Sequence, residues 1–266
     1  MLHSNYFVSV VNLMRMWLVV LGIALILTGC RFWSLYKFGE QFCEFDEYVK
    51  VSQQSGASHI DFDEPVLPQA VLLRYLHALP FKSSYQTMDN NAAMVKSDIF
   101  YIQRLLNPKP LDEKKVYKID VEYHPVGKTP LLSSGELDAR LSALFSPKVV
   151  EPILKSFCSD DYDLSLDRLN MRFTLENIEA ENLPEKQLFI TSFGLPDKDE
   201  HNTLRYQFDF LNKDSKGASQ LQNRPITFSF SFNPQNVLTS MHILYHKYDY
   251  ILDFENMNGS LLVIRG

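Results

Sequence analysis

The sequence lacks the short motifs that mark most enzymes. It contains no Gly-x-Ser-x-Gly nucleophile turn, no phosphate-binding loop, no His-Glu-x-x-His, no Cys-x-x-Cys and no dinucleotide-binding glycine pattern. The seven histidines are scattered, and His242 and His246 would stand about 13 Å apart on an extended strand. We therefore expect a protein that is not an enzyme and that holds no metal or cofactor.

An excess of positive charge is also missing. Lysine and arginine number 26 against 32 acidic residues, which gives a formal net charge of −6. Proteins that bind nucleic acid present a basic face, and segments that bind anionic lipids carry clusters of Lys and Arg. The charge argues against both kinds of partner. Hydrophobic residues at 45% and only ten glycines indicate an ordinary globular interior.

No apolar run is long enough for a comfortable membrane span, which needs about 20 residues. An uncharged apolar run extends from Met16 to Leu27 and follows Arg15, the one charged residue before it. A positive start, a short apolar stretch and a small residue at the cleavage position are typical of a secretory signal. We expect residues 1–29 to be a signal peptide.

The end of this run, Leu27-Thr28-Gly29-Cys30, resembles the lipobox of bacterial lipoproteins. The resemblance implies that Cys30 becomes the first residue and receives acyl chains such as palmitate. Each buried methylene contributes about 0.8 kcal/mol, so several chains hold a protein firmly to a bilayer. Because Arg31 rather than Asp follows, the sorting pattern of such lipoproteins implies the outer membrane, facing the periplasm. An uncleaved anchor, or a plain signal peptide with a chance cysteine, are the alternatives.

The sequence has three cysteines, and lipidation of Cys30 leaves Cys43 and Cys158. Exported chains keep disulfides, so we expect these two to be bonded. The loop between them exceeds a hundred residues, for which the chain-entropy estimate is about 4–5 kcal/mol. Two separate buried thiols are the alternative.

Spacing of apolar residues and of turn residues predicts the remaining elements. The aromatic-rich segment 30–44 is expected to pack on the body, 82–98 to be a loop, and 98–106 to be either strand or helix. Expected strands are 45–51, 115–123, 168–175, 204–210, 226–232, 237–245, 248–254 and 261–264; expected helices are 69–79, 133–145, 147–158 and 183–193.

Two local signals support this assignment. Ser133 and Glu136 have the spacing of a helix capping box, and Asn258-Gly259 is typical of a two-residue hairpin. The predicted fold class is α+β, with antiparallel sheets, helices packed on one face and a C-terminal β-meander. We divide the body into an α+β region at 45–182 and a helix-plus-meander region at 183–266.

Part of the C-terminal region has a resemblance of its own. A helix ending in Phe193-Gly194-Leu195-Pro196-Asp197 precedes Leu204-Arg205-Tyr206 and 226–230. This order resembles the small lipoprotein of the outer-membrane barrel-assembly machine, over about residues 183–245. The resemblance implies a helix that feeds a three-stranded antiparallel sheet, and nothing further is carried over.

Strand alternation separates two faces of this predicted sheet. The aromatic face should pack on the helix; it carries Tyr206, Phe208, Phe210, Phe228, Phe230 and Phe232. The opposite face should be wet and open to a partner; it carries Arg205, Gln207, Asp209, Thr227, Ser229 and Ser231.

The sequence favours a non-enzymatic, lipid-anchored envelope protein that binds a protein partner. One alternative is a lipoprotein that binds a small molecule or lipid in a pocket between sheet and helices. A less favoured alternative is an envelope hydrolase whose site is assembled from distant residues.

Overall fold

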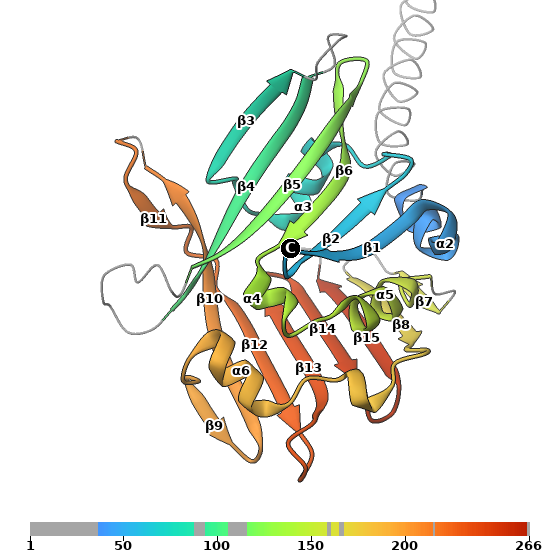
Figure 1. Ribbon diagram of the computed structural model, residues 1–266, viewed down its shortest axis with the longest axis vertical. Helices are drawn as coiled ribbons and strands as arrows, with labels where there is room; N and C mark the ends of the chain where they lie inside the picture. Colours follow the sequence, from blue (N-terminus) through green and yellow to red (C-terminus); the bar gives the residue numbers. More distant parts are fainter. Residues whose placement is uncertain are drawn as a thin grey trace, which may run out of the picture.

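The computed structural model describes residues 37–87, 94–105, 116–158, 161–164, 168–214 and 216–264. One large antiparallel sheet dominates them (Figure 1). Its strands are β1 Val49–Gln54, β2 Ala57–Phe62, β3 Lys82–Thr87, β4 Met94–Arg104, β5 Val116–Val126, β6 Thr129–Leu137, β7 Tyr162–Leu164, β8 Arg168–Thr174, β9 Lys198–Glu200, β10 Thr203–Lys213, β11 Ser219–Leu221, β12 Ile226–Phe232, β13 Leu238–Tyr245, β14 Tyr248–Asp253 and β15 Asn258–Ile264.

The helices are short. They are α2 Phe45–Tyr48, α3 Gln69–Leu76, α4 Ala139–Ser142, α5 Pro147–Lys155, α6 Lys186–Phe193 and the 3₁₀ turn η2 Ala180–Asn182, and residues 37–43 are also helical. Within the described residues, none of these helices has the length and apolar character needed to cross a bilayer. The chain is therefore sheet-dominated, which corrects the expectation of a balanced α+β fold with helices layered on one face; the antiparallel pairing is confirmed.

The sheet runs in the order β1-β2-β6-β5-β4-β10-β12-β13-β14-β15-β8-β7, and β12 to β15 form the predicted C-terminal meander. Strands β4 and β10 join its two halves through only three residue pairs, Phe208 with Arg104, Asp209 with Gln103 and Phe210 with Ile102. Strand β8 pairs along its length with β15. Residues on both sides of the sequence-based boundary at 182 are thus hydrogen-bonded in one sheet.

The core lies against the aromatic face of this sheet. In Figure 1, α4, α5 and α6 lie in front of its lower part and α3 lies behind β5 and β6. Phe189 of α6 packs on Phe230 with ring centroids 4.3 Å apart, and Phe193 packs on Tyr206 at 5.2 Å. Helix α6 ends at Gly194, whose φ of 80° favours glycine. The predicted helix and its aromatic contact face are confirmed.

Several expected elements of the N-terminal half are wrong. Residues 45–48 form helix α2, and the strand begins only at Val49. The expected loop at 82–98 holds β3 and the start of β4, and the ambiguous segment after it is strand. Strand β3 pairs only with β4, and Lys82, Ser83, Tyr85 and Gln86 are exposed, so its sequence shows no apolar alternation.

The expected helix at 133–145 begins instead as strand β6, which continues to Leu137. Glu136 pairs with Asp120 of β5 and with His59 of β2, so its spacing from Ser133 has no capping role. The helix that does form, α4, starts later and is capped by the carboxylate of Asp138, which accepts a hydrogen bond from the Arg140 main-chain nitrogen at 2.9 Å.

The Asn258-Gly259 pair also has a different role. Both residues lie inside β15, and the β14–β15 turn is made by the residues before them. Gly259 pairs with Phe173, and a Cβ built on Gly259 would lie 2.2 Å from that ring. Glycine is thus required here by the close approach of an aromatic ring.

The Cys43–Cys158 disulfide predicted from the sequence is present, with Cα atoms 4.7 Å apart. It fixes the helical residues 37–43 next to the end of α5. Phe42 lies between Phe62 of β2 and Phe157, at centroid distances of 6.4 and 5.8 Å. The described part of segment 30–44 therefore packs on the body as expected.

Candidate functional site

The outer face of the meander is the candidate site. Strand register brings together Arg205 of β10, Ser229 of β12, His242 of β13 and Ile251 of β14 in one row across the sheet. Gln207 and Thr227 form the row on one side, and Ser231 lies opposite Thr203 on the other. Five of the six sequence-predicted face residues thus share one surface. The aromatic residues between them point to the other side, where the described helices α5 and α6 pack.

Asp209, the sixth predicted residue, does not belong to this surface. It is 1% exposed and accepts hydrogen bonds from the Arg224 main-chain nitrogen at 3.1 Å on both carboxylate oxygens. Burial raises its pKa, and these hydrogen bonds oppose the shift. The reason is its position: Asp209 lies where β4 pairs with β10, so strand and loop cover it.

Three residues of this surface were missed at the sequence level. Leu244 and Ile251 are 44% and 39% exposed, although they are large aliphatic side chains. His242 lies on the same strand as Leu244 and directly opposite Ile251, and its Nε2 is 2.7 Å from Asp249 Oδ1. The same alternation rule, applied to 237–245 and 248–254, would have placed them on the outer face. We call Arg205, Gln207, Thr227, Ser229, Ser231, His242, Leu244 and Ile251 the outer face.

The outer face is mixed in its chemical composition. It combines small hydroxyl side chains, exposed aliphatic groups and a single Arg at its margin, and of these the exposed aliphatic groups and the Arg are common at protein contact surfaces. Its one ion pair, His242 with Asp249, is solvent-accessible on both sides, with side chains 44% and 35% exposed. Ser229 lies directly opposite His242 across β12 and β13, so a hydroxyl group is next to this pair.

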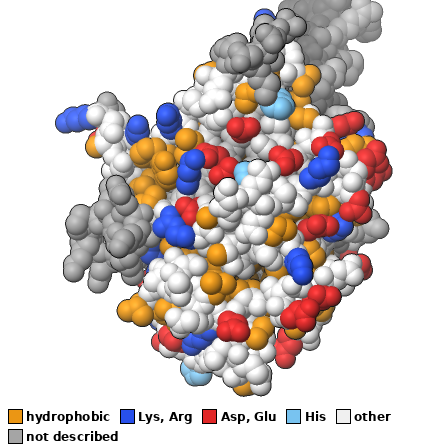
Figure 2. Space-filling model, viewed as in Figure 1, with side chains coloured by type: hydrophobic (Ala, Val, Ile, Leu, Met, Phe, Trp, Pro, Cys, Tyr) orange, Lys and Arg blue, Asp and Glu red, His pale blue; other side chains and the backbone are white. Residues whose placement is uncertain are grey.

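A groove of about 1290 Å³ lies elsewhere, between α5 and the ends of β8 and β15. Its walls carry both signs of charge, including Lys148, Glu151, Lys155 and Glu179. Lys155 is already engaged, because its Nζ lies 2.7 Å from Asp46 and 2.9 Å from Glu151. On the face shown in Figure 2, acidic and basic side chains are likewise interspersed. The groove is therefore open and polar, without one dominant charge.

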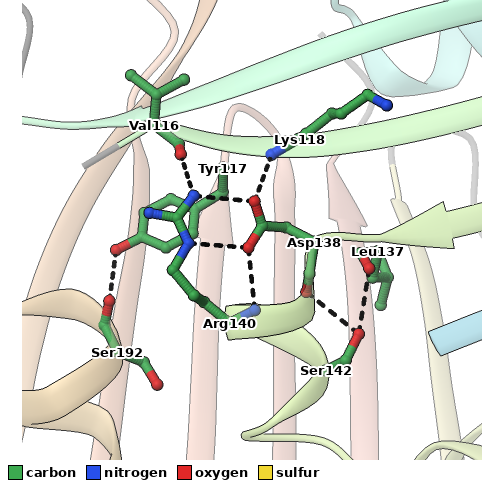
Figure 3. Close-up of polar contacts among 8 residues, drawn as sticks. All are labelled: Val116, Tyr117, Lys118, Leu137, Asp138, Arg140, Ser142 and Ser192. Carbon is green, nitrogen blue, oxygen red and sulfur yellow. Dashed lines mark hydrogen bonds and ion pairs between the residues drawn. The ribbon is translucent and has the colours of Figure 1, made fainter. Parts of the chain in front are cut away.

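A network of polar contacts connects helix α4, strand β5 and helix α6 (Figure 3). The Arg140 guanidinium stacks on the Tyr117 ring at 4.5 Å and donates to Asp138 and to the Val116 carbonyl oxygen. The Tyr117 hydroxyl donates to the Ser192 carbonyl oxygen at 2.7 Å. Burial alone would raise the pKa of Asp138, but the hydrogen bonds from Arg140 outweigh it and hold this pKa below its usual value. The network holds α4, β5 and α6 in place, and its acid, Asp138, and its base, Arg140, are paired with each other.

A buried cation lies at the junction between the two halves of the sheet. The Arg104 side chain is 0% exposed and its Nη1 lies 2.6 Å from Asp197 Oδ2. It also donates to the carbonyl oxygens of Gln207 and Leu195, both at 3.1 Å, and stacks on Tyr206 at 4.6 Å. The turn after α6, noted for its Gly-x-Pro-Asp sequence, thus supplies the counter-ion for the β4–β10 junction.

The remaining sequence-predicted residue, Cys30, lies outside the described residues. Within the described ranges, no group of three or more His, Cys, Asp or Glu side chains could hold a metal ion. No family model matches the chain, and neither the curated proteins nor the solved structures contain a match to it.

Proposed function

We propose that this chain is a bacterial envelope lipoprotein, anchored to the outer membrane through acylated Cys30, that binds a protein partner on its outer face. The observation that carries the proposal is the outer face itself. Its hydroxyl and aliphatic side chains lie opposite the helix-covered core, and Leu244 and Ile251 remain substantially exposed. A partner that covered these two side chains would remove their apolar surface from water, which favours binding.

Two further features support export and anchoring. The Cys43–Cys158 bond is of a kind that persists in oxidising compartments. The lipobox-like Leu27-Thr28-Gly29-Cys30 precedes the described body by only a few residues. The Cys30→Ser variant should leave the membrane fraction, since acyl chains supply most of the binding energy. Retention of this variant in washed membranes would contradict the anchor.

Site-specific crosslinking in living cells tests the partner. A photo-reactive residue at Ser229 of the full, anchored chain should capture one envelope protein reproducibly. The matched control carries the same probe at Gln86, an exposed position on β3. Ile251→Arg should abolish capture from Ser229 without changing the thermal stability of the protein, because this side chain is exposed. Equal capture from both positions would contradict the outer face as a binding surface.

The groove beside α5 favours a second candidate, recognition of a polar ligand or an extended peptide segment. Its volume of about 1290 Å³ exceeds that of most small-ligand sites, and its lining is mixed rather than apolar. A probe at Lys148, which is exposed and lines the groove, separates the two candidates. Capture from Lys148 but not from Ser229 would move the binding site to the groove.

A further inference from the structure

A smaller pocket, of about 510 Å³, lies between the end of α3 and the β10–β11 hairpin. Its polar lining consists of cationic and amide side chains, including Arg74, His77, Asn212, Gln220, Asn223 and Arg224. No acidic residue is among the described residues that line it. In a chain whose net charge is −6, this is a local reversal of sign.

The surroundings of His77 show the same reversal. Its ring meets that of His246 edge-on, with centroids 4.5 Å apart. Burial lowers the pKa of His77, and the nearby charges that lower it further belong to His246, Lys247, Arg224 and Arg74. These groups come from α3, the segment before β12 and the β13–β14 turn, so basic residues converge from three elements.

The structure supplies too little negative charge to balance them. The Arg224 guanidinium donates to the His77 carbonyl oxygen, at the end of α3, where the helix dipole amounts to about half a negative charge. The acid beneath, Asp209, binds the Arg224 main chain, and its own burial disfavours ionisation. Arg74, Arg224 and Lys247 carry three full charges, which exceed the dipole and Asp209 together.

We propose that this pocket binds a phosphate group. Arg74 is exposed at its wall, and the side-chain amides of Asn212 and Gln220 face it from the β10–β11 side. A phosphate accepts hydrogen bonds in several directions at once, and Arg is the side chain best shaped to donate to it. Arg224 adds positive charge behind the bound group.

The phosphate can belong to a soluble molecule or to a lipid headgroup. Leu79 is 57% exposed in the lining and Tyr75, next to Arg74, is 45% exposed. An acyl chain would cover such side chains, whereas inorganic phosphate would not touch them. The relative affinity for the two ligands therefore distinguishes the source.

Calorimetric titration of the full chain tests the site with two probes, inorganic phosphate and monomeric dihexanoyl phosphatidic acid. Arg74→Ala should weaken binding of either probe about tenfold, because it removes a charge-assisted hydrogen bond. Lys198→Ala is the control, since Lys198 is an equally exposed cation on β9, and it should leave binding unchanged.

Similar affinities for the two probes would assign a soluble phosphorylated ligand, and much tighter binding of the phosphatidic acid would assign a lipid headgroup. The proposal is overturned if neither probe binds, or if Arg74→Ala and Lys198→Ala weaken binding equally. Both variants should keep the wild-type melting temperature, because each removes an exposed side chain.

Discussion

The Arg104–Asp197 pair gives the sharpest test of how the sheet is held together. Asp197→Ala would leave the buried guanidinium of Arg104 without its counter-ion at the three-residue junction of β4 and β10. Breaking a buried pair from one side costs about 3–5 kcal/mol. Because the Asp197 side chain is 26% exposed and water can reach it, we expect the lower end, about 3 kcal/mol.

A control of the same chemistry lies two residues away. Asp199 pairs with Lys186 at 2.9 Å, but its side chain is 48% exposed. Exposed pairs contribute at most about 1 kcal/mol, so Asp199→Ala should be nearly neutral. Both variants replace Asp by Ala in the same segment. Asp197 also accepts a hydrogen bond from the Gln207 main-chain nitrogen, and the cation that it leaves behind is 0% exposed, against 17% for Lys186.

Urea unfolding at neutral pH measures both free energies. The double variant Arg104→Met with Asp197→Ala adds a second criterion. It removes the buried charge together with its partner, so it should be more stable than Asp197→Ala alone. If Asp197→Ala destabilises the protein no more than Asp199→Ala does, the junction does not depend on this ion pair and the reasoning fails.

Three further predictions concern stability. Gly259→Ala should lower the free energy of unfolding by about 1–3 kcal/mol in urea melts, because its Cβ would meet the Phe173 ring; no loss would show that the ring moves freely. Replacing Cys43 and Cys158 together by Ser should cost about 2–5 kcal/mol, and a reducing agent should then have no further effect on the melting temperature. The lowered pKa of Asp138 stabilises the fold above the usual carboxyl pKa, and this contribution is lost as the pH falls toward the lowered value. Asp138→Asn should therefore flatten the acid end of the stability profile, and an unchanged profile would contradict the assignment.

The C-terminal strands were predictable because one of their faces is buried and the other is wet. In β10 and β12 this produces a clean alternation of aromatic and polar residues. The edge strand β3 has one neighbour and little burial, so its sequence carries no such signal. Ser133 and Glu136 have the spacing of a helix start, but that spacing carries no information about cross-strand partners, and Glu136 pairs with Asp120 in the sheet.

The candidate site shows the same limit. Alternation correctly assigns Arg205, Gln207 and Ser229 to one face, but it does not reveal where that face ends. Asp209 follows the alternation and is nevertheless buried, because β4 joins the sheet at that point. The phosphate pocket is assembled from residues near 74, 212 and 224, and sequence order gives no reason to group them.

The disulfide also sets the path of mechanical load through the molecule. A tether that enters ahead of residue 37 would otherwise pull on β1, a strand at the end of the sheet with one neighbour. Tension applied at the end of such a strand breaks its hydrogen bonds to β2 one after another. The Cys43–Cys158 bond would instead pass the force covalently to the end of α5, so β1 would stay unloaded under tension applied from the N-terminal side.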